Sequence, residues 1–149
     1  MANSYYKQES DNFETYKISN NCNFNGNLTQ VFQYIIRREH KHHSPAEDIK
    51  KAIDFSNFEM QRITNCKKNL YAPVEDENLI NTYADYLKGK DRFAYDVFQK
   101  LLEIINTCYI KPQECKCGKD TVSNECKKKA LQRLNELLDL LNCELNKML

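Results

Sequence analysis

The stretch SNECKKKALQRLNELLDLLNCELNK, residues 123–147, carries the clearest structural pattern in the sequence. Charged residues, among them Glu136 and Asp139, occupy one side of a helical projection, and apolar residues recur on the other at the spacing of one helix face. The stretch therefore predicts an amphipathic helix over residues 123–147, which has to bury its apolar face against other elements. The apolar positions are Ala130, Leu131, Leu134, Leu137, Leu138, Leu141 and Leu145, and Met148 directly after the stretch continues the pattern.

Three more helices are predicted upstream of this one. The first covers residues 27–41, where apolar residues keep helical spacing. The second covers residues 45–69 and begins at Ser44-Pro45-Ala46-Glu47, a capping box with proline at the first helical position. The third covers residues 75–108 and is expected to be kinked or split at Gly89. Because no run alternates apolar and polar residues, the sequence predicts an all-α protein, a four-helix bundle with a broken third helix.

The length and charge of the chain limit its class. A chain of 149 residues suits one domain, and we expect an N-terminal arm over 1–21, or a short helix there, followed by a helical bundle domain over 22–149. Its 22 basic and 21 acidic side chains leave a net charge of +1, which argues against a generally basic nucleic-acid binder. No apolar run approaches the ~18 residues that would span a bilayer, so no membrane insertion is expected.

Seven cysteines point to an oxidising compartment and to a secreted protein. The start, MANSYYKQES, lacks the features of a signal peptide, so secretion implies that a signal has been removed. An odd number of cysteines allows at most three internal bridges, and the sequence does not choose among the pairings. Asn27-Leu28-Thr29 is a sequon for N-glycosylation, which agrees with secretion.

No motif for catalysis is present. Cys108, Cys115, Cys117 and Cys126 lack the paired spacing of a zinc site, so disulfides around a loop at 109–122 are favoured over a metal. The histidines of His40-Lys41-His42-His43 are expected in a solvated linker. The sequence therefore predicts a protein that is not an enzyme and that holds no metal and no cofactor.

Charged residues on the polar helix faces are candidate contacts for a protein partner, against the simpler interpretation as solvated surface. Lys127 opens the last helix, where the helix dipole disfavours a cation. The other candidates lie near the ends or on the polar faces of the predicted helices. The full set is Arg37, Arg38, Glu39, Arg92, Lys100, Glu103, Lys127 and Arg133.

The layout resembles the short-chain four-helix cytokines, the group around interleukin-4, interleukin-13, interleukin-7 and interleukin-9. The likeness covers residues 22–148. It rests on Cys22-Asn23-Phe24 before the first helix, on Ile105-Asn106-Thr107-Cys108 at the end of the third, on a Cys-rich loop and on a Leu-rich last helix. This resemblance implies a secreted ligand that brings type I cytokine receptor chains together at the cell surface. It also implies an up-up-down-down topology.

The resemblance further implies three disulfides, among them a bridge from Cys22 to Cys143 by analogy with interleukin-4 and interleukin-7. The other cysteines assigned to bridges are Cys66, Cys108, Cys117 and Cys126. We expect a monomer, with an intermolecular disulfide open to the odd cysteine.

One feature departs from this family. Residues 109–122 can cross a bundle, but residues 41–44 are too few for the first long crossover that the topology needs. An up-and-down bundle is the alternative. In function, the alternatives are a helical Cys-rich surface or secreted binding protein of a parasite or other pathogen and, below it, a carrier of a lipid or small molecule.

Overall fold

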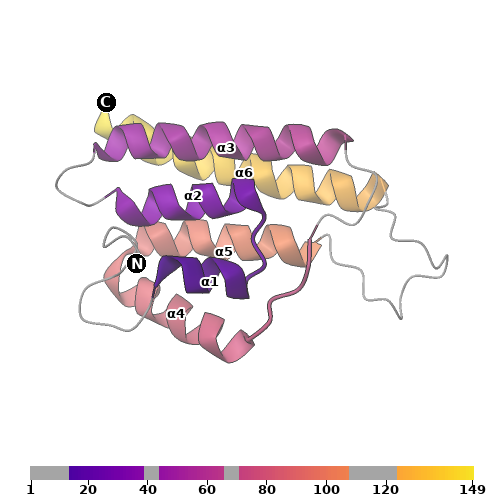
Figure 1. Cartoon of the computed structure of the whole chain (residues 1–149). Helices are drawn as coiled ribbons and strands as arrows, with labels where there is room; N and C mark the ends of the chain where they lie inside the picture. The colour runs from indigo at the N-terminus through magenta and orange to yellow at the C-terminus, as the bar shows by residue number, and fades with distance from the viewer. Residues whose placement is uncertain (1–13, 39–43, 66–70, 108–123) are drawn as a thin grey trace.

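A computed structural model of the chain describes residues 14–38, 44–65, 71–107 and 124–149. Within these ranges the protein is all-helical and has no strand, which confirms the predicted class (Figure 1). The helices are α1 (Thr15–Asn21), α2 (Gly26–Arg37), α3 (Pro45–Asn65), α4 (Glu77–Lys90), α5 (Arg92–Thr107) and α6 (Asn124–Met148). No helix in these ranges is long and apolar enough to cross a membrane.

Four helices, α2, α3, α5 and α6, contact one another in pairs. α2 packs against α3 and α5, and α6 packs against the same two helices. α4 packs against α5, and α1 lies against α2 and α4 (Figure 1). The α2–α3 pair and the α5–α6 pair therefore form two opposite sides of the helix assembly.

The up-up-down-down topology is wrong for this chain. α2 and α3 run in opposite directions, as Figure 1 shows. Only seven residues, 38–44, separate these helices, and a short connection produces antiparallel neighbours. The short linker at residues 41–44 had already indicated in the sequence that the first two helices of the bundle are antiparallel.

All six helices contribute to one hydrophobic core. Its centre is an aromatic cluster in which Phe98 of α5 meets Tyr83 of α4 and Phe32 of α2, with ring centroids 5.2 and 5.4 Å apart. Phe24 packs edge-on against Phe32 at 5.8 Å. Fully buried leucines of α6 complete the core, in agreement with the predicted apolar face: Leu134, Leu137 and Leu141.

Two of the predicted helix boundaries have identifiable caps. α3 begins at Pro45, and the Ser44 hydroxyl accepts a hydrogen bond from the Glu47 backbone N–H at 3.3 Å. The break expected near Gly89 lies at Asp91, between α4 and α5. Asp91 caps α5, because its carboxylate accepts from the Ala94 backbone N–H at 3.1 Å.

α1 lies within the segment expected as an arm or a short helix, and its Ile18 is buried in the common core. Asn23, in the turn to α2, has a positive φ of 55°, a conformation that asparagine tolerates. Its Nδ2 donates to the Pro73 carbonyl at 2.6 Å. Asn21 accepts from the backbone N–H groups of Glu75 at 2.9 Å and Asp76 at 3.0 Å. These bonds fasten the end of α1 to the segment before α4.

The bridge expected between Cys22 and Cys143 is not formed, because both residues carry free thiols. Cys22 is buried at the end of α1, the helix that packs against α2 and α4. Cys143 is exposed on α6, which packs against α3 and α5. Cys126 is half-buried against the core. The remaining cysteines assigned to bridges lie outside the described residues: Cys66, Cys108 and Cys117.

We expect serine substitutions at Cys22 and Cys143 to have unequal effects. Cys22→Ser should lower the free energy of unfolding by about 1 to 3 kcal/mol, because it buries a hydroxyl in the core. Cys143→Ser should change it by less than about 0.5 kcal/mol. Urea denaturation of both variants measures the difference. Equal losses of stability would indicate that Cys22 and Cys143 are bridged after all.

Candidate functional site

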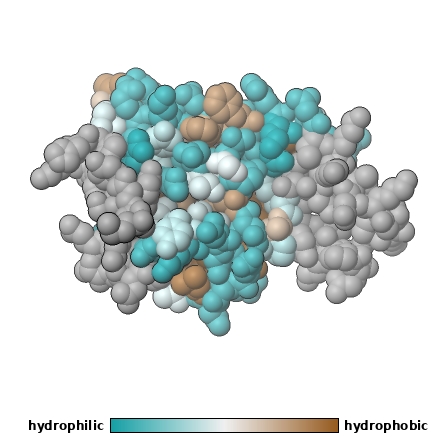
Figure 2. All heavy atoms as spheres, in the orientation of Figure 1, coloured by the Kyte–Doolittle hydropathy of each residue, from teal (hydrophilic) through white to brown (hydrophobic). Residues whose placement is uncertain are grey.

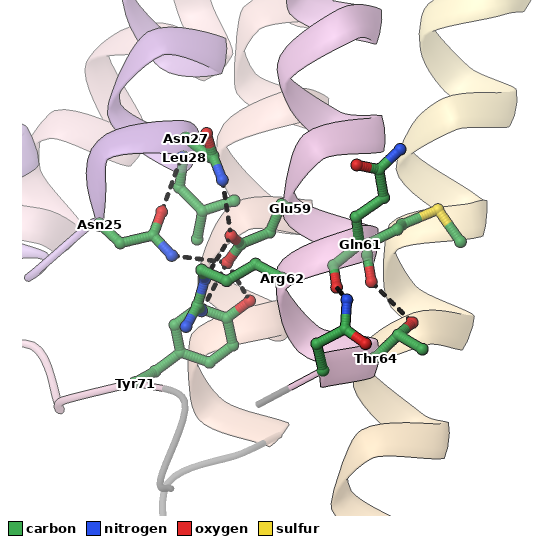
Figure 3. Close-up of polar contacts among 10 residues, drawn as sticks. Asn25, Asn27, Leu28, Glu59, Gln61, Arg62, Thr64 and Tyr71 are labelled. Carbon is green, nitrogen blue, oxygen red and sulfur yellow. Dashed lines mark hydrogen bonds and ion pairs between the residues drawn. The ribbon is translucent and has the colours of Figure 1, made fainter. Parts of the chain in front are cut away.

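Glu59 of α3 is the centre of a buried polar cluster (Figure 3). Its side chain has no exposed area. Arg62 makes a two-pronged ion pair with it, Nε to Oε1 at 2.7 Å and Nη2 to Oε2 at 2.9 Å. The Tyr71 hydroxyl donates to Oε2 at 2.6 Å. Asn25 Nδ2 donates to Oε2 at 2.6 Å, and Asn27 Nδ2 donates to Oε1 at 3.1 Å.

These donors decide the charge state of Glu59. Burial alone would raise the pKa of Glu59, since it penalises the charged form. Hydrogen bonds from Arg62, Tyr71 and Asn27, together with the Arg62 charge, outweigh burial and hold the pKa below its ordinary value of 4.5. The carboxylate is therefore ionised at neutral pH and engaged on both oxygens.

The cluster fixes three parts of the chain to one another. Asn25 caps α2 by accepting from the Leu28 backbone N–H at 2.9 Å, while its amide donates to Glu59 on α3. Tyr71 brings in the segment after α3. The start of α2, the last turns of α3 and the approach to α4 are consequently held at fixed positions.

Asn27, the expected glycosylation site, belongs to this cluster. Its side-chain nitrogen, the atom that would carry a glycan, donates to a fully buried carboxylate. The Thr29 hydroxyl of the same sequon donates to the Phe24 carbonyl at 3.3 Å. A sugar on Asn27 would therefore compete with the packing of α2 on α3, and glycosylation stays a prediction.

Aromatic rings extend from the polar cluster along the outside of α2 and α3. Tyr34 of α2 stacks on Phe55 of α3, with ring centroids 6.0 Å apart. Phe55 meets Phe58 edge-on at 5.6 Å. Phe58 is 50% exposed, and in Figure 2 brown, apolar atoms lie at the surface over the middle of α3 among teal ones. Of these three rings only Phe58 is exposed, whereas Tyr34 and Phe55 are partly buried against the core.

An arginine lies at each end of the row. Arg37 sits over the Tyr34 ring at 4.3 Å and pairs with Asp48 at 3.4 Å. Arg62, in contact with Glu59, lies 5.6 Å from the Tyr71 ring centroid. The two partner carboxylates are buried, whereas the guanidinium side chains are 23% and 35% exposed. We call Tyr34, Arg37, Phe55, Phe58 and Arg62 the α2–α3 face.

The α2–α3 face is suited to contact with another molecule. It combines one exposed aromatic ring, Phe58, with two partly exposed arginines, and aromatic and arginine side chains are enriched at protein interfaces. The carboxylates that pair with its two arginines, on Asp48 and Glu59, are buried, and the Asp54 carboxylate one turn before Phe58 is exposed. Across the described parts of the chain, no three His, Cys, Asp or Glu side chains are close enough to share a metal ion.

The structure brings together three of the charged residues that were expected to contact a receptor. Lys100 of α5 lies 3.1 Å from Glu103 and 3.4 Å from Glu136 of α6. Arg133 pairs with Glu136 at 2.9 Å and lies 3.9 Å from Glu103. Desolvation would raise the pKa of Glu136, but hydrogen bonding to Arg133 and the charges of Lys100 and Arg133 hold it below its ordinary value. This cluster ties α5 to α6, and such exposed pairs contribute little stability.

Arg38 was expected to contact a partner protein, but the structure buries it. Its side chain is buried and makes a two-pronged ion pair with Asp91, both bonds at 2.8 Å. It also donates to the Ile35 carbonyl at 2.8 Å and lies over the Phe93 ring. Arg38 therefore joins α2 to the junction of α4 and α5 and is not a surface contact.

The other expected contacts are dispersed. Arg92 is exposed at the start of α5, where it pairs with Asp96 at 3.3 Å. Lys127 lies near the end of α3, with its Nζ 3.5 Å from the Thr64 carbonyl oxygen. Glu39 lies outside the described residues.

Sequence reasoning missed Glu59 as the centre of the polar cluster, although a signal was present. Buried positions on α3 follow the sequence Ala52, Ser56, Glu59 and Ile63, which is the spacing of one helix face. A carboxylate on that face has to be paired if it is buried.

Comparisons with protein-family models, with curated proteins and with solved structures found no match to this chain.

Proposed function

We propose that this chain is a non-catalytic helical ligand that acts by binding another protein through the α2–α3 face. The observation that carries the proposal is the exposed Phe58 ring, packed on Phe55 and set between Arg37 and Arg62. A few residues carry most of the binding energy at protein interfaces, and aromatic and arginine side chains are enriched in such contacts. A half-exposed phenylalanine held in place by a second ring is a suitable anchor for such a contact.

The partner that we favour is a cell-surface receptor protein, as expected for a secreted ligand. The mutual packing of α2, α3, α5 and α6 supports a four-helix bundle as the scaffold of such a ligand. The antiparallel α2–α3 pair differs from the parallel first pair of the type I cytokines. We therefore propose receptor binding, as the resemblance to cytokines implies, but not the cytokine topology. Secretion, glycosylation and disulfides among the other cysteines remain part of the proposal.

A second candidate is a helical Cys-rich surface or secreted binding protein of a parasite or other pathogen. The antiparallel order of α2 and α3 favours it, because helices in an up-and-down arrangement are joined by short connections and do not need the long crossover connections of cytokines. It shares the α2–α3 face as contact surface. The two candidates differ in whether binding gathers receptor chains and starts a signal in the bound cell.

Binding of the fluorescently labelled chain to cells of its own source, and to cells of a host if there is one, tests the proposal. Phe58→Ala should weaken saturable binding at least roughly tenfold, as expected of an interface anchor. Tyr16→Ala is the matched control, since Tyr16 is an aromatic residue of α1 that is 42% exposed and lies away from the α2–α3 face. Both variants should keep the helical circular dichroism of the wild type.

Trypsin treatment of the cells should abolish the binding, because the proposed partner is a protein. Equal affinities of Phe58→Ala and wild type would contradict the proposal. Receptor phosphorylation or another signal in the bound cell would favour the cytokine-like ligand over the second candidate.

A further inference from the structure

The dipeptide Asn25-Gly26, at the start of α2, places a chemically reactive bond beside the Glu59 cluster. It is the only Asn-Gly pair in the sequence. Asparagine is among the thermolabile residues, and a glycine after it has no Cβ to keep the next backbone nitrogen away from the asparagine side chain. In an unconstrained chain the Gly26 nitrogen can therefore reach the side-chain carbon of Asn25.

The reaction that this pair permits is deamidation, whose only co-reactant is water. The Gly26 backbone nitrogen gives up its proton and forms a bond to Cγ of Asn25. The bond from Cγ to Nδ2 breaks, and the departing amide group takes up a proton and leaves as ammonia. Water then opens the resulting ring at either of its carbonyl carbons. Residue 25 becomes aspartate or isoaspartate, with a carboxylate in place of the amide.

The folded structure holds the Asn25 amide at both ends (Figure 3). Its Oδ1 accepts from the Leu28 backbone N–H at 2.9 Å, and its Nδ2 donates to Glu59 Oε2 at 2.6 Å. Ring closure requires Cγ to move toward the Gly26 nitrogen and to release Nδ2, so both hydrogen bonds have to break first. The reaction is therefore confined to molecules in which the start of α2 has opened away from Glu59.

Neither packing nor backbone conformation requires glycine at position 26. Gly26 is exposed in the first turn of α2, and a Cβ there would meet nothing within 4 Å beyond its chain neighbours and its own helix backbone. Alanine would fit this position, and its Cβ would hinder the approach of the backbone nitrogen to Asn25. Gly26→Ala consequently separates the reactivity of the pair from the fold.

The product of the reaction would replace an attraction in the Glu59 cluster by a repulsion. An aspartate at position 25 can still cap α2, but its second carboxylate oxygen would lie where Nδ2 now donates to Glu59. Two carboxylates at hydrogen-bond distance disfavour each other's charged form. Isoaspartate also adds a methylene group to the backbone where α2 begins, which displaces the cap. Both products weaken the packing of α2 on α3.

We propose that Asn25 is a modification site, where opening of the Glu59 cluster permits deamidation and deamidation in turn loosens α2 from α3. The loss of ammonia makes this a one-way step. The contact between Asn25 and Glu59 then protects the chain from the change, and the time that a molecule spends open sets how fast the change accumulates. This inference does not depend on the proposed function.

Peptide mapping by mass spectrometry tests the site, since it measures deamidation of each asparagine in the whole chain over time. Wild type is incubated in mildly alkaline buffer, either folded or unfolded in guanidinium chloride. Asn25 should react faster than every other asparagine in the unfolded chain, and at least about tenfold more slowly in the folded chain. Gly26→Ala should slow the reaction of the unfolded chain at least about tenfold. Equal rates in the folded and unfolded chain, or no excess reaction at Asn25 when unfolded, would overturn the proposal.

A matched pair of variants tests whether the Glu59 cluster is the gate. Glu59→Gln keeps the size of the side chain but removes the charge that strengthens its hydrogen bond with Asn25, so deamidation in the folded chain should be several-fold faster. Glu47→Gln changes an exposed carboxylate of the same helix and should leave the rate as in wild type. Circular dichroism establishes that both variants are folded. The same rate in Glu59→Gln as in wild type would contradict gating by this cluster.

The consequence of the modification is tested separately by Asn25→Asp and Asn25→Ser. Both substitutions remove the amide donor and keep an oxygen that can cap α2, but only the aspartate adds a charge beside Glu59. Asn25→Asp should therefore unfold at a lower urea concentration than Asn25→Ser. A midpoint for Asn25→Asp that equals or exceeds that of Asn25→Ser would show that deamidation does not loosen α2 from α3.

Discussion

Replacing Glu59 by alanine should destabilise the protein by about 2 to 4 kcal/mol. Removing one partner of a buried ion pair costs roughly 3 to 5 kcal/mol, and the loss here is smaller because Arg62 is partly exposed. The substitution also leaves the Tyr71 hydroxyl and the amides of Asn25 and Asn27 without the carboxylate that accepts from them. Urea denaturation followed by circular dichroism measures the change.

Glu47→Gln is the control for this prediction. Glu47 is an exposed carboxylate of the same helix that pairs with Lys50 at 3.4 Å, and its loss should cost less than about 0.5 kcal/mol. Similar costs for the two substitutions would mean that the Glu59 cluster does not hold α2 and α3 together.

The Glu59 cluster also makes stability depend on pH. Because the pKa of Glu59 is lower in the folded chain than its ordinary value of 4.5, its ionised form stabilises the fold above that value. This contribution is lost as the pH falls from about 4.5 through the lower folded pKa. Wild type should therefore lose stability more steeply than Glu59→Ala over that acidic range, as measured by urea midpoints at successive pH values.

Replacing Arg38 by methionine should cost about 3 kcal/mol. Methionine retains most of the apolar volume beside Phe93, but the Asp91 carboxylate is left largely buried without its cation. Burial would then raise the pKa of Asp91, which the hydrogen bonds and charge of Arg38 now hold below its ordinary value. Denaturant unfolding of the variant gives the loss.

Arg92→Met provides the comparison for Arg38. Arg92 is 66% exposed and pairs with Asp96 on the helix surface, so its removal should change stability by less than about 0.5 kcal/mol. Arg38→Met combined with Asp91→Ala should cost less than the sum of the single changes, because the two residues share one interaction. Additive losses would contradict the buried pair.

Helix positions followed from local patterns in the sequence because the signals that set them are local. Pro45 with Ser44 before it predicts the start of α3 correctly, since both residues act within one helical turn. The break between α4 and α5 was expected near Gly89, but its structural cause is the cap that Asp91 provides two residues later. Gly89 itself is the last-but-one residue of α4.

The polar clusters did not follow from the sequence, because their partners are distant in the chain. Arg38 meets Asp91 across 53 positions, and Asn25 meets Glu59 across 34. Each of these residues looks like ordinary surface charge when its own helix is considered alone. The start of α2 shows the same limit on a smaller scale, because Asn25 caps it two residues before the predicted start at residue 27, and Asn27 instead contacts Glu59.

The fastening of α1 to the segment before α4 has a consequence for the order of folding. Asn23 and Pro73 are 50 positions apart, so their bond requires closing a long loop, whereas seven residues connect α2 to α3. A helix of seven residues does not persist alone, and we therefore expect α1 to dock after its neighbours have formed. We expect the same step to reverse first, so that amide exchange in α1 is faster than in α2 or α5 and the Cys22 thiol is uncovered while the other helices remain folded.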